Sequence, residues 1–150
     1  MKYTEKMSNK LNELLERNYD AEKGYLNASE NIESEQLKMY FNERAAQRSQ
    51  FAKELRTEIL MFGQIPDESG SFKGSAHRVW MDIKALFKGN DENAILEECI
   101  RGEKAIIDEY NQVLSKQATL PISTANLLVK QRNEIQVAID NVKWLEEASA

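Results

Sequence analysis

The chain has 150 residues, of which 41% are hydrophobic and 30% charged, and its formal net charge at pH 7 is −5. This length and composition are those of one globular domain, and no segment approaches the ~20 consecutive apolar residues of a membrane span. The negative charge argues against nucleic acid as a partner. The single cysteine, Cys99, excludes an internal disulfide and cysteine metal clusters, and it predicts a reducing, cytoplasmic environment.

Apolar residues recur at three- and four-residue spacing in four long segments, which predicts four long helices. The expected helices cover about residues 8–29, 35–62, 91–117 and 124–147. A short amphipathic helix is expected at about residues 76–88, inside the long connection between the second and third segments. No segment alternates apolar and polar residues over the length of a strand, so the predicted fold is all-α.

Local signals mark where some of these helices begin and end. Ser34, followed by the acidic Glu35, is a suitable N-cap for the second long helix. Gly63 suits the left-handed position just after the end of the same helix. Pro121 and Ser123 are expected to open the last long helix.

The lengths of the connections predict the topology. Short links within each pair of long helices make two antiparallel hairpins, and the long crossover joins one hairpin to the other. We therefore expect residues 1–150 to form a single four-helix-bundle domain. A bundle with one long crossover has the topology of ferritin-like proteins.

A weak internal repeat places polar residues at matching points of the predicted inner faces. Glu22 matches Glu103, and the Gln-Arg pair at 47–48 matches the pair at 131–132. Buried carboxylates need a compensating positive charge, which a guanidinium supplies through two parallel hydrogen bonds. We therefore expect a metal-free polar layer in the core, made of Glu22, Gln47, Arg48, Glu103, Gln131 and Arg132.

A di-iron or di-manganese centre is the alternative use of these carboxylates. Such centres take one glutamate from each of two helices and a Glu-x-x-His pair from each of the other two. The ligands here would be Glu22, Glu103 and Glu134, but no long helix contains a Glu-x-x-His, and the only histidine is His77 in the crossover. We therefore expect no cofactor and no catalytic residue, with the di-metal centre as the alternative.

The crossover carries a compact polar and aromatic group, His77, Arg78, Trp80 and Asp82. No serine or cysteine has a spacing that pairs it with His77, so we interpret this histidine as a surface or capping residue. Cys99 falls on a core face, where we expect a buried thiol without reactivity. The apolar face of the crossover helix must pack on the bundle or on a second copy, which makes a homodimer the expected partnership.

Two strings of residues carry a resemblance to a known family. They are Gly-Ser-x-x-Gly-x-x-His-Arg-x-Trp-x-Asp-x-Lys at 70–84 and Glu-Cys-x-x-Gly-Glu at 98–103. With residues 47–55 they resemble a bacterial family of ferritin-like four-helix-bundle proteins of unknown function. The resemblance spans nearly the whole chain and implies a relative of ferritins and rubrerythrins in which a metal site has decayed or been rebuilt. It brings no assigned activity.

We therefore expect a structural or binding protein, with a part in stress response suggested by analogy alone. The alternative function is a divergent di-metal protein that handles iron or peroxide.

Overall fold

The computed structural model describes residues 3–68, 92–115 and 120–148. These residues form four helices, which are α1 (Tyr3–Glu30), α2 (Glu35–Met61), α4 (Glu92–Leu114) and α5 (Ile122–Ala148). No strand occurs in this part of the chain, so the all-α prediction is confirmed. None of the four helices is long and apolar enough to cross a membrane. The short helix expected at 76–88 lies outside the described residues.

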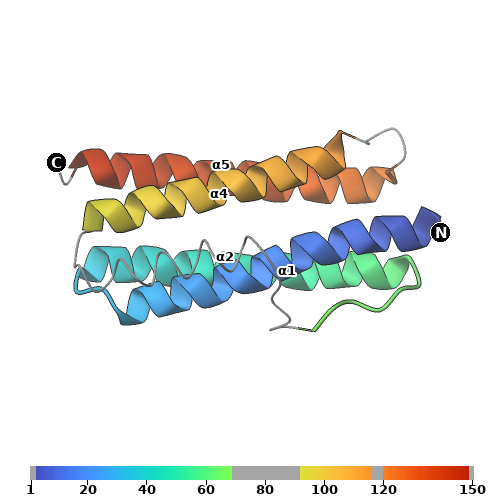
Figure 1. The fold of residues 1–150 in the computed structure, drawn as a ribbon, viewed down its shortest axis with the longest axis horizontal. Coiled ribbons are helices and arrows are strands. Elements are labelled where there is room, and N and C mark those ends of the chain that lie inside the picture. Colours follow the sequence, from blue (N-terminus) through green and yellow to red (C-terminus); the bar gives the residue numbers. More distant parts are fainter. Residues whose placement is uncertain (1–2, 69–91, 116–119, 149–150) are drawn as a thin grey trace.

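The four helices form two antiparallel hairpins that lie on each other as two layers (Figure 1). Helix α1 packs along α2, and α4 packs along α5. The two hairpins meet where α1 faces α4 and where α2 faces α5. Helices α2 and α4 therefore lie diagonally across the core, and the two ends of the chain lie at opposite ends of the bundle (Figure 1).

Both ends of α2 are fixed by the residues that the sequence indicates. The Ser34 hydroxyl accepts a hydrogen bond from the Leu37 backbone N–H at 3.3 Å. At the other end Gly63 has φ 77°, and the N–H groups of Gly63 and Gln64 donate back to the carbonyls of Leu60 and Ile59. This pair of bonds is the Schellman motif, which needs a left-handed residue and therefore favours glycine. Both predicted end signals are confirmed.

The other ends differ from the prediction by a few residues. Helix α1 begins at Tyr3, because the buried Met7 extends the apolar stripe one turn beyond Leu11. Helix α5 begins at Ile122, and the Ala125 N–H donates to the Pro121 carbonyl at 3.0 Å.

The first turn of α5 is joined to α2 through Glu58. The Glu58 carboxylate accepts hydrogen bonds from the Thr124 hydroxyl at 2.5 Å and from the Ser123 hydroxyl at 3.2 Å. A carboxylate near a helix N-terminus also interacts favourably with the helix dipole.

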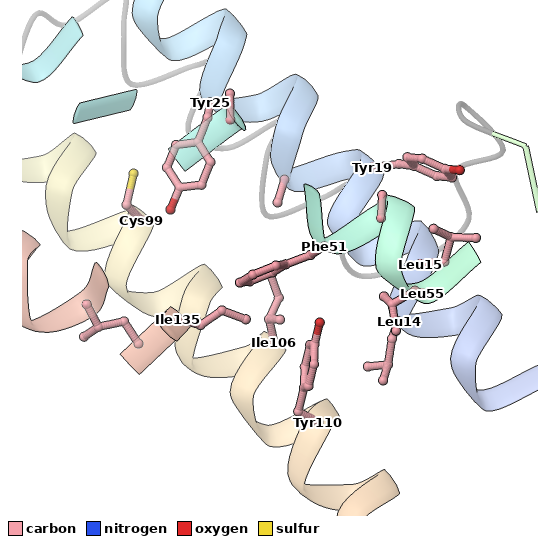
Figure 2. Close-up of a cluster of buried hydrophobic side chains, with 14 of the residues drawn as sticks. Leu14, Leu15, Tyr19, Tyr25, Phe51, Leu55, Cys99, Ile106, Tyr110 and Ile135 are labelled. Atoms are coloured by element: carbon pink, nitrogen blue, oxygen red, sulfur yellow. The ribbon is translucent and has the colours of Figure 1, made fainter. Parts of the chain in front are cut away.

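The centre of the core combines apolar and polar side chains. Figure 2 shows one part of it, where Phe51 from α2, Ile106 from α4 and Ile135 from α5 meet. Among the largest fully buried side chains, however, are Arg48 and Tyr110. Buried polar groups are stable only when they are paired, so their partners define the candidate site.

Candidate functional site

An arginine and a glutamate meet at the centre of the bundle. Arg48 on α2 has no exposed surface, and Glu103 on α4 is 1% exposed. Arg48 Nη1 donates to Glu103 Oε1 at 3.0 Å, and Arg48 Nη2 donates to Glu103 Oε2. Two parallel charge-assisted bonds are the strongest way for a guanidinium to hold a carboxylate. The pair therefore ties the two hairpins together across the diagonal of the core.

The surroundings of Arg48 keep its guanidinium protonated. Burial alone would lower the pKa of Arg48, but the adjacent Glu103 carboxylate and the hydrogen bonds to it raise that pKa above its ordinary value. Gln47 adds a weak contact, accepting from Arg48 Nε at 3.5 Å. The ring of Phe51 lies 5.7 Å from the guanidinium carbon, a distance that suits a cation–π contact. Arg48 is therefore a permanent buried cation.

Three further titratable side chains near the pair are held in their neutral forms. Burial and the charge of Glu103 raise the pKa values of Tyr25, Tyr40 and Cys99. Figure 2 shows the Tyr25 hydroxyl directed toward α4 in the region of Cys99. Because the reactive form of a cysteine is the thiolate, a buried thiol with a raised pKa is a poor nucleophile. Cys99 is buried, as the sequence predicts.

A chain of hydrogen bonds links all four helices. Asn18 Nδ2 on α1 donates to the Tyr110 hydroxyl on α4 at 2.9 Å, and that hydroxyl donates to Gln131 Oε1 on α5 at 2.7 Å. Gln131 Nε2 in turn donates on α2 to the Phe51 carbonyl at 3.3 Å and to Glu54 Oε1 at 3.2 Å. The chain fixes the relative register of the two hairpins.

The structure brings together some of the residues predicted for the polar layer and separates others. The structure brings Arg48 and Glu103 together, with Gln47 beside them, and it buries Gln131. The hydrogen bonds of Gln131 within the described residues go to Tyr110, to the Phe51 carbonyl and to Glu54, and none goes to the ion pair. Among the described residues, the core therefore contains one buried Glu–Arg pair, whereas the predicted layer holds two glutamates and two arginines.

The prediction that Glu22 and Arg132 belong to the core layer is wrong, because both side chains are partly exposed. Glu22 is partly exposed and lines a hollow between α1 and α2, together with Lys53 and Arg56. Arg132 is also partly exposed and donates to Asn111 Oδ1 at 3.0 Å. Successive helical residues are separated by 100°, and in both cases the preceding residue, Ala21 or Gln131, takes the buried position.

The di-metal alternative does not fit the described residues. Its proposed ligands, Glu22, Glu103 and Glu134, do not form a cluster. In the described part of the chain, no three histidine, cysteine or acidic side chains lie close enough together to hold a metal ion. Glu103 is the buried member of the three, and both of its oxygens already face the Arg48 guanidinium. A metal ion there would lie against a fixed positive charge. The crossover residues His77, Arg78, Trp80 and Asp82 lie outside the described residues.

One interhelical ion pair has no counterpart in the sequence predictions. Arg17 Nε on α1 donates to Glu109 Oε1 on α4 at 2.8 Å, near the surface. Both residues line a hollow of about 500 Å³ between the two helices. The available signal was the regular 3-4-3 spacing of Met7, Lys10, Leu14 and Arg17, which puts cationic and apolar side chains on one face of α1.

Comparison with known proteins gives a family and a fold. The family model described as "Domain of unknown function (DUF2383)" matches residues 6–116. No curated protein matches the chain. Among solved structures, a bacterioferritin from Desulfovibrio desulfuricans, studied at its diiron site in different catalytic states, matches with a TM-score of 0.71 and 19% identity. The match covers 98% of this chain and 84% of the bacterioferritin chain. The protein therefore belongs to the family of unknown function DUF2383, and its fold is a ferritin-like four-helix bundle.

Proposed function

We propose that the protein is a non-catalytic structural or binding protein whose core is held by a metal-free Glu/Arg/Gln layer. The observation that carries the proposal is the Arg48–Glu103 pair, with both side chains almost fully buried. The guanidinium supplies the positive charge that Glu103 requires in a medium of low polarity. The layer then has a structural role that needs no cofactor.

The neighbouring groups support a non-catalytic core. A general acid or base works best when its pKa lies near the working pH, whereas the pKa values of Tyr25, Tyr40 and Cys99 are raised. Neither of the two hollows described between helices is lined by Arg48 or Glu103. A substrate in either hollow would therefore not touch the ion pair.

Cellular location and oligomeric state are two further parts of the proposal. We propose a cytoplasmic location, because a single cysteine suits a reducing compartment. We also propose a homodimer formed through residues 76–88, which light scattering coupled to size-exclusion chromatography tests directly.

Metal content is the measurement that tests the metal-free core. Untagged protein is incubated anaerobically with ferrous iron or with manganese, desalted, and analysed by elemental mass spectrometry. We expect no stoichiometric metal, and unfolding that is unaffected by a chelator. About two metals per chain, as in di-metal bundles, would overturn the proposal in favour of the iron- or peroxide-handling alternative.

A matched pair of variants shows whether the pair itself excludes metal. Arg48→Met removes the buried cation and leaves the Glu103 carboxylate, whereas Arg132→Met removes a partly exposed cation of the same type. We expect both variants to remain metal-free, because the described residues lack a ligand set for Glu103 to join. Stoichiometric metal in Arg48→Met alone would show that a latent ligand set surrounds Glu103.

A further inference from the structure

The hollow between α1 and α4 lies where the two hairpins meet, away from the central ion pair. The apolar residues that line it are Met7 and Leu14 on α1 and Val113 on α4, which are 6%, 1% and 7% exposed. Its volume of about 500 Å³ is within the range of roughly 300–1,000 Å³ that is usual for sites of small organic ligands. The hollow is thus large enough for a small molecule with an apolar body.

Two cations stand beside this apolar surface. Lys10 and Arg17 lie two turns apart on α1, and both line the hollow. Arg17 Nε donates a hydrogen bond to Glu109 Oε1 at 2.8 Å. The other two guanidinium nitrogens, Nη1 and Nη2, make no hydrogen bond to a described residue. The Arg17 side chain is 17% exposed, so its position is constrained by packing as well as by the ion pair. A fixed guanidinium with two available N–H groups suits a carboxylate.

The charge balance of the lining disfavours a ligand with several negative charges. Lys10 and Arg17 are offset by Glu109 and by Glu13, which also lines the hollow. A phosphate or other polyanion would meet repulsion from both carboxylates. A monocarboxylate needs only the Nη1 and Nη2 edge of Arg17, with Lys10 nearby, and its apolar tail enters the hollow beside the exposed edges of Met7 and Val113.

From these contacts we propose that the α1–α4 hollow is a binding site for a small amphiphilic monocarboxylate, such as a medium-chain fatty acid. The proposal rests on the binding role proposed above and names a ligand class for it. The site shares no residue with the Arg48–Glu103 pair. A negative binding result therefore leaves the metal-content result standing, and the reverse also holds.

Octanoate and 1-octanol are the probes, because they share a chain length and differ in the charged head. The full-length ¹⁵N-labelled protein is titrated with each compound, and affinities are measured by calorimetry. We expect octanoate to bind more tightly than octanol and to shift the amide signals of Met7, Leu14 and Val113. Absence of octanoate binding, or equal affinity for octanol, would overturn the proposal.

Variants that remove a charge but keep a similar side-chain size identify the residues that bind the carboxylate of octanoate. We expect Arg17→Met and Lys10→Met each to weaken octanoate binding by about fivefold, the effect of one ion pair at a partly exposed position, and to leave octanol unchanged. Lys10 is exposed, so its variant keeps the test valid even if Arg17→Met folds poorly. Lys53→Met, which removes the same charge beside the other hollow, should change neither affinity. An equal loss in Lys53→Met would show a general charge effect and contradict the assignment.

Discussion

Two arginine–glutamate pairs join α4 to the α1–α2 hairpin, and they differ in how far water reaches them. In the central pair, the side chains of Arg48 and Glu103 are 0% and 2% exposed. In the peripheral pair, those of Arg17 and Glu109 are 17% and 29% exposed. The chemistry is the same in both places, but the surrounding medium is not.

This difference in medium determines what each pair can do. If one residue of the central pair is removed, water cannot solvate the buried charge that is left. The central pair therefore stabilises the fold and is not free to bind a ligand. Water or a solute can satisfy the peripheral pair, so Arg17 is able to bind a ligand while it still contacts Glu109. The central pair is therefore a structural element, and the peripheral pair is the better candidate for recognition.

Breaking the central pair should have the largest effect on stability. Arg48→Leu strands Glu103 in the core, and we expect it to lower the free energy of unfolding by about 3–5 kcal/mol. The double variant Arg48→Leu/Glu103→Leu should recover most of this loss, because it leaves no unpaired buried charge. Urea unfolding of the single and double variants measures both changes. A loss below about 1 kcal/mol in Arg48→Leu would mean that water reaches Glu103, and the contrast between the two pairs would fail.

The central region should also lose stability at alkaline pH. The folded pKa values of Tyr25, Tyr40, Tyr110 and Cys99 are raised above their ordinary values of 10.0 for the phenols and 9.0 for the thiol, mainly by burial. The unfolded chain therefore releases protons that the folded chain retains. Stability is then complete below about pH 9. It falls by about 1.4 kcal/mol per pH unit for the thiol above about pH 9 and for each phenol above about pH 10.

Urea midpoints measured from neutral pH to about pH 11 test this decline. Tyr40→Phe removes one of the titrating groups and should make the alkaline slope shallower, although it also loses the 2.8 Å hydrogen bond to the Ala138 carbonyl at every pH. The lost hydrogen bond lowers stability equally at every pH, so a change in the slope reports the titration of Tyr40 alone. A stability that stays constant through this range would place the phenols in contact with water and remove the distinction between core and periphery.

Local patterns in the sequence were sufficient for the helices and for several of their ends. Ser34 and Gly63 act through bonds to residues within one turn, so their roles can be predicted from neighbours alone. The inward-facing member of each Gln-Arg pair could not be predicted in this way. Arg48 rather than Gln47 faces the core of α2, but Gln131 rather than Arg132 faces it on α5. Neighbouring positions differ by 100° around a helix, and packing between helices decides between them.

Long-range partners were the second limit of sequence reasoning. Arg48 and Glu103 are 55 positions apart, and Arg17 and Glu109 are 92 apart. Helical periodicity says which side of a helix a residue occupies, but not which residue of another helix lies opposite. The central pair could be predicted because the carboxylates expected in the core required cations, whereas Arg17 and Glu109 lie near the surface and required no partner.

Breaking the peripheral pair should have the smallest effect on the free energy of unfolding. Arg17→Met leaves Glu109 able to reach water, so we expect a loss of at most about 1 kcal/mol in the free energy of unfolding. A double-mutant cycle with Glu109→Gln should give a coupling of about 0.2–1 kcal/mol that shrinks as salt is added, since partly exposed charges are screened. The coupling of the central pair should keep its value at the same salt concentrations. A salt-independent coupling of several kcal/mol between Arg17 and Glu109 would show a second structural pair, and it would remove the reason for assigning recognition to Arg17.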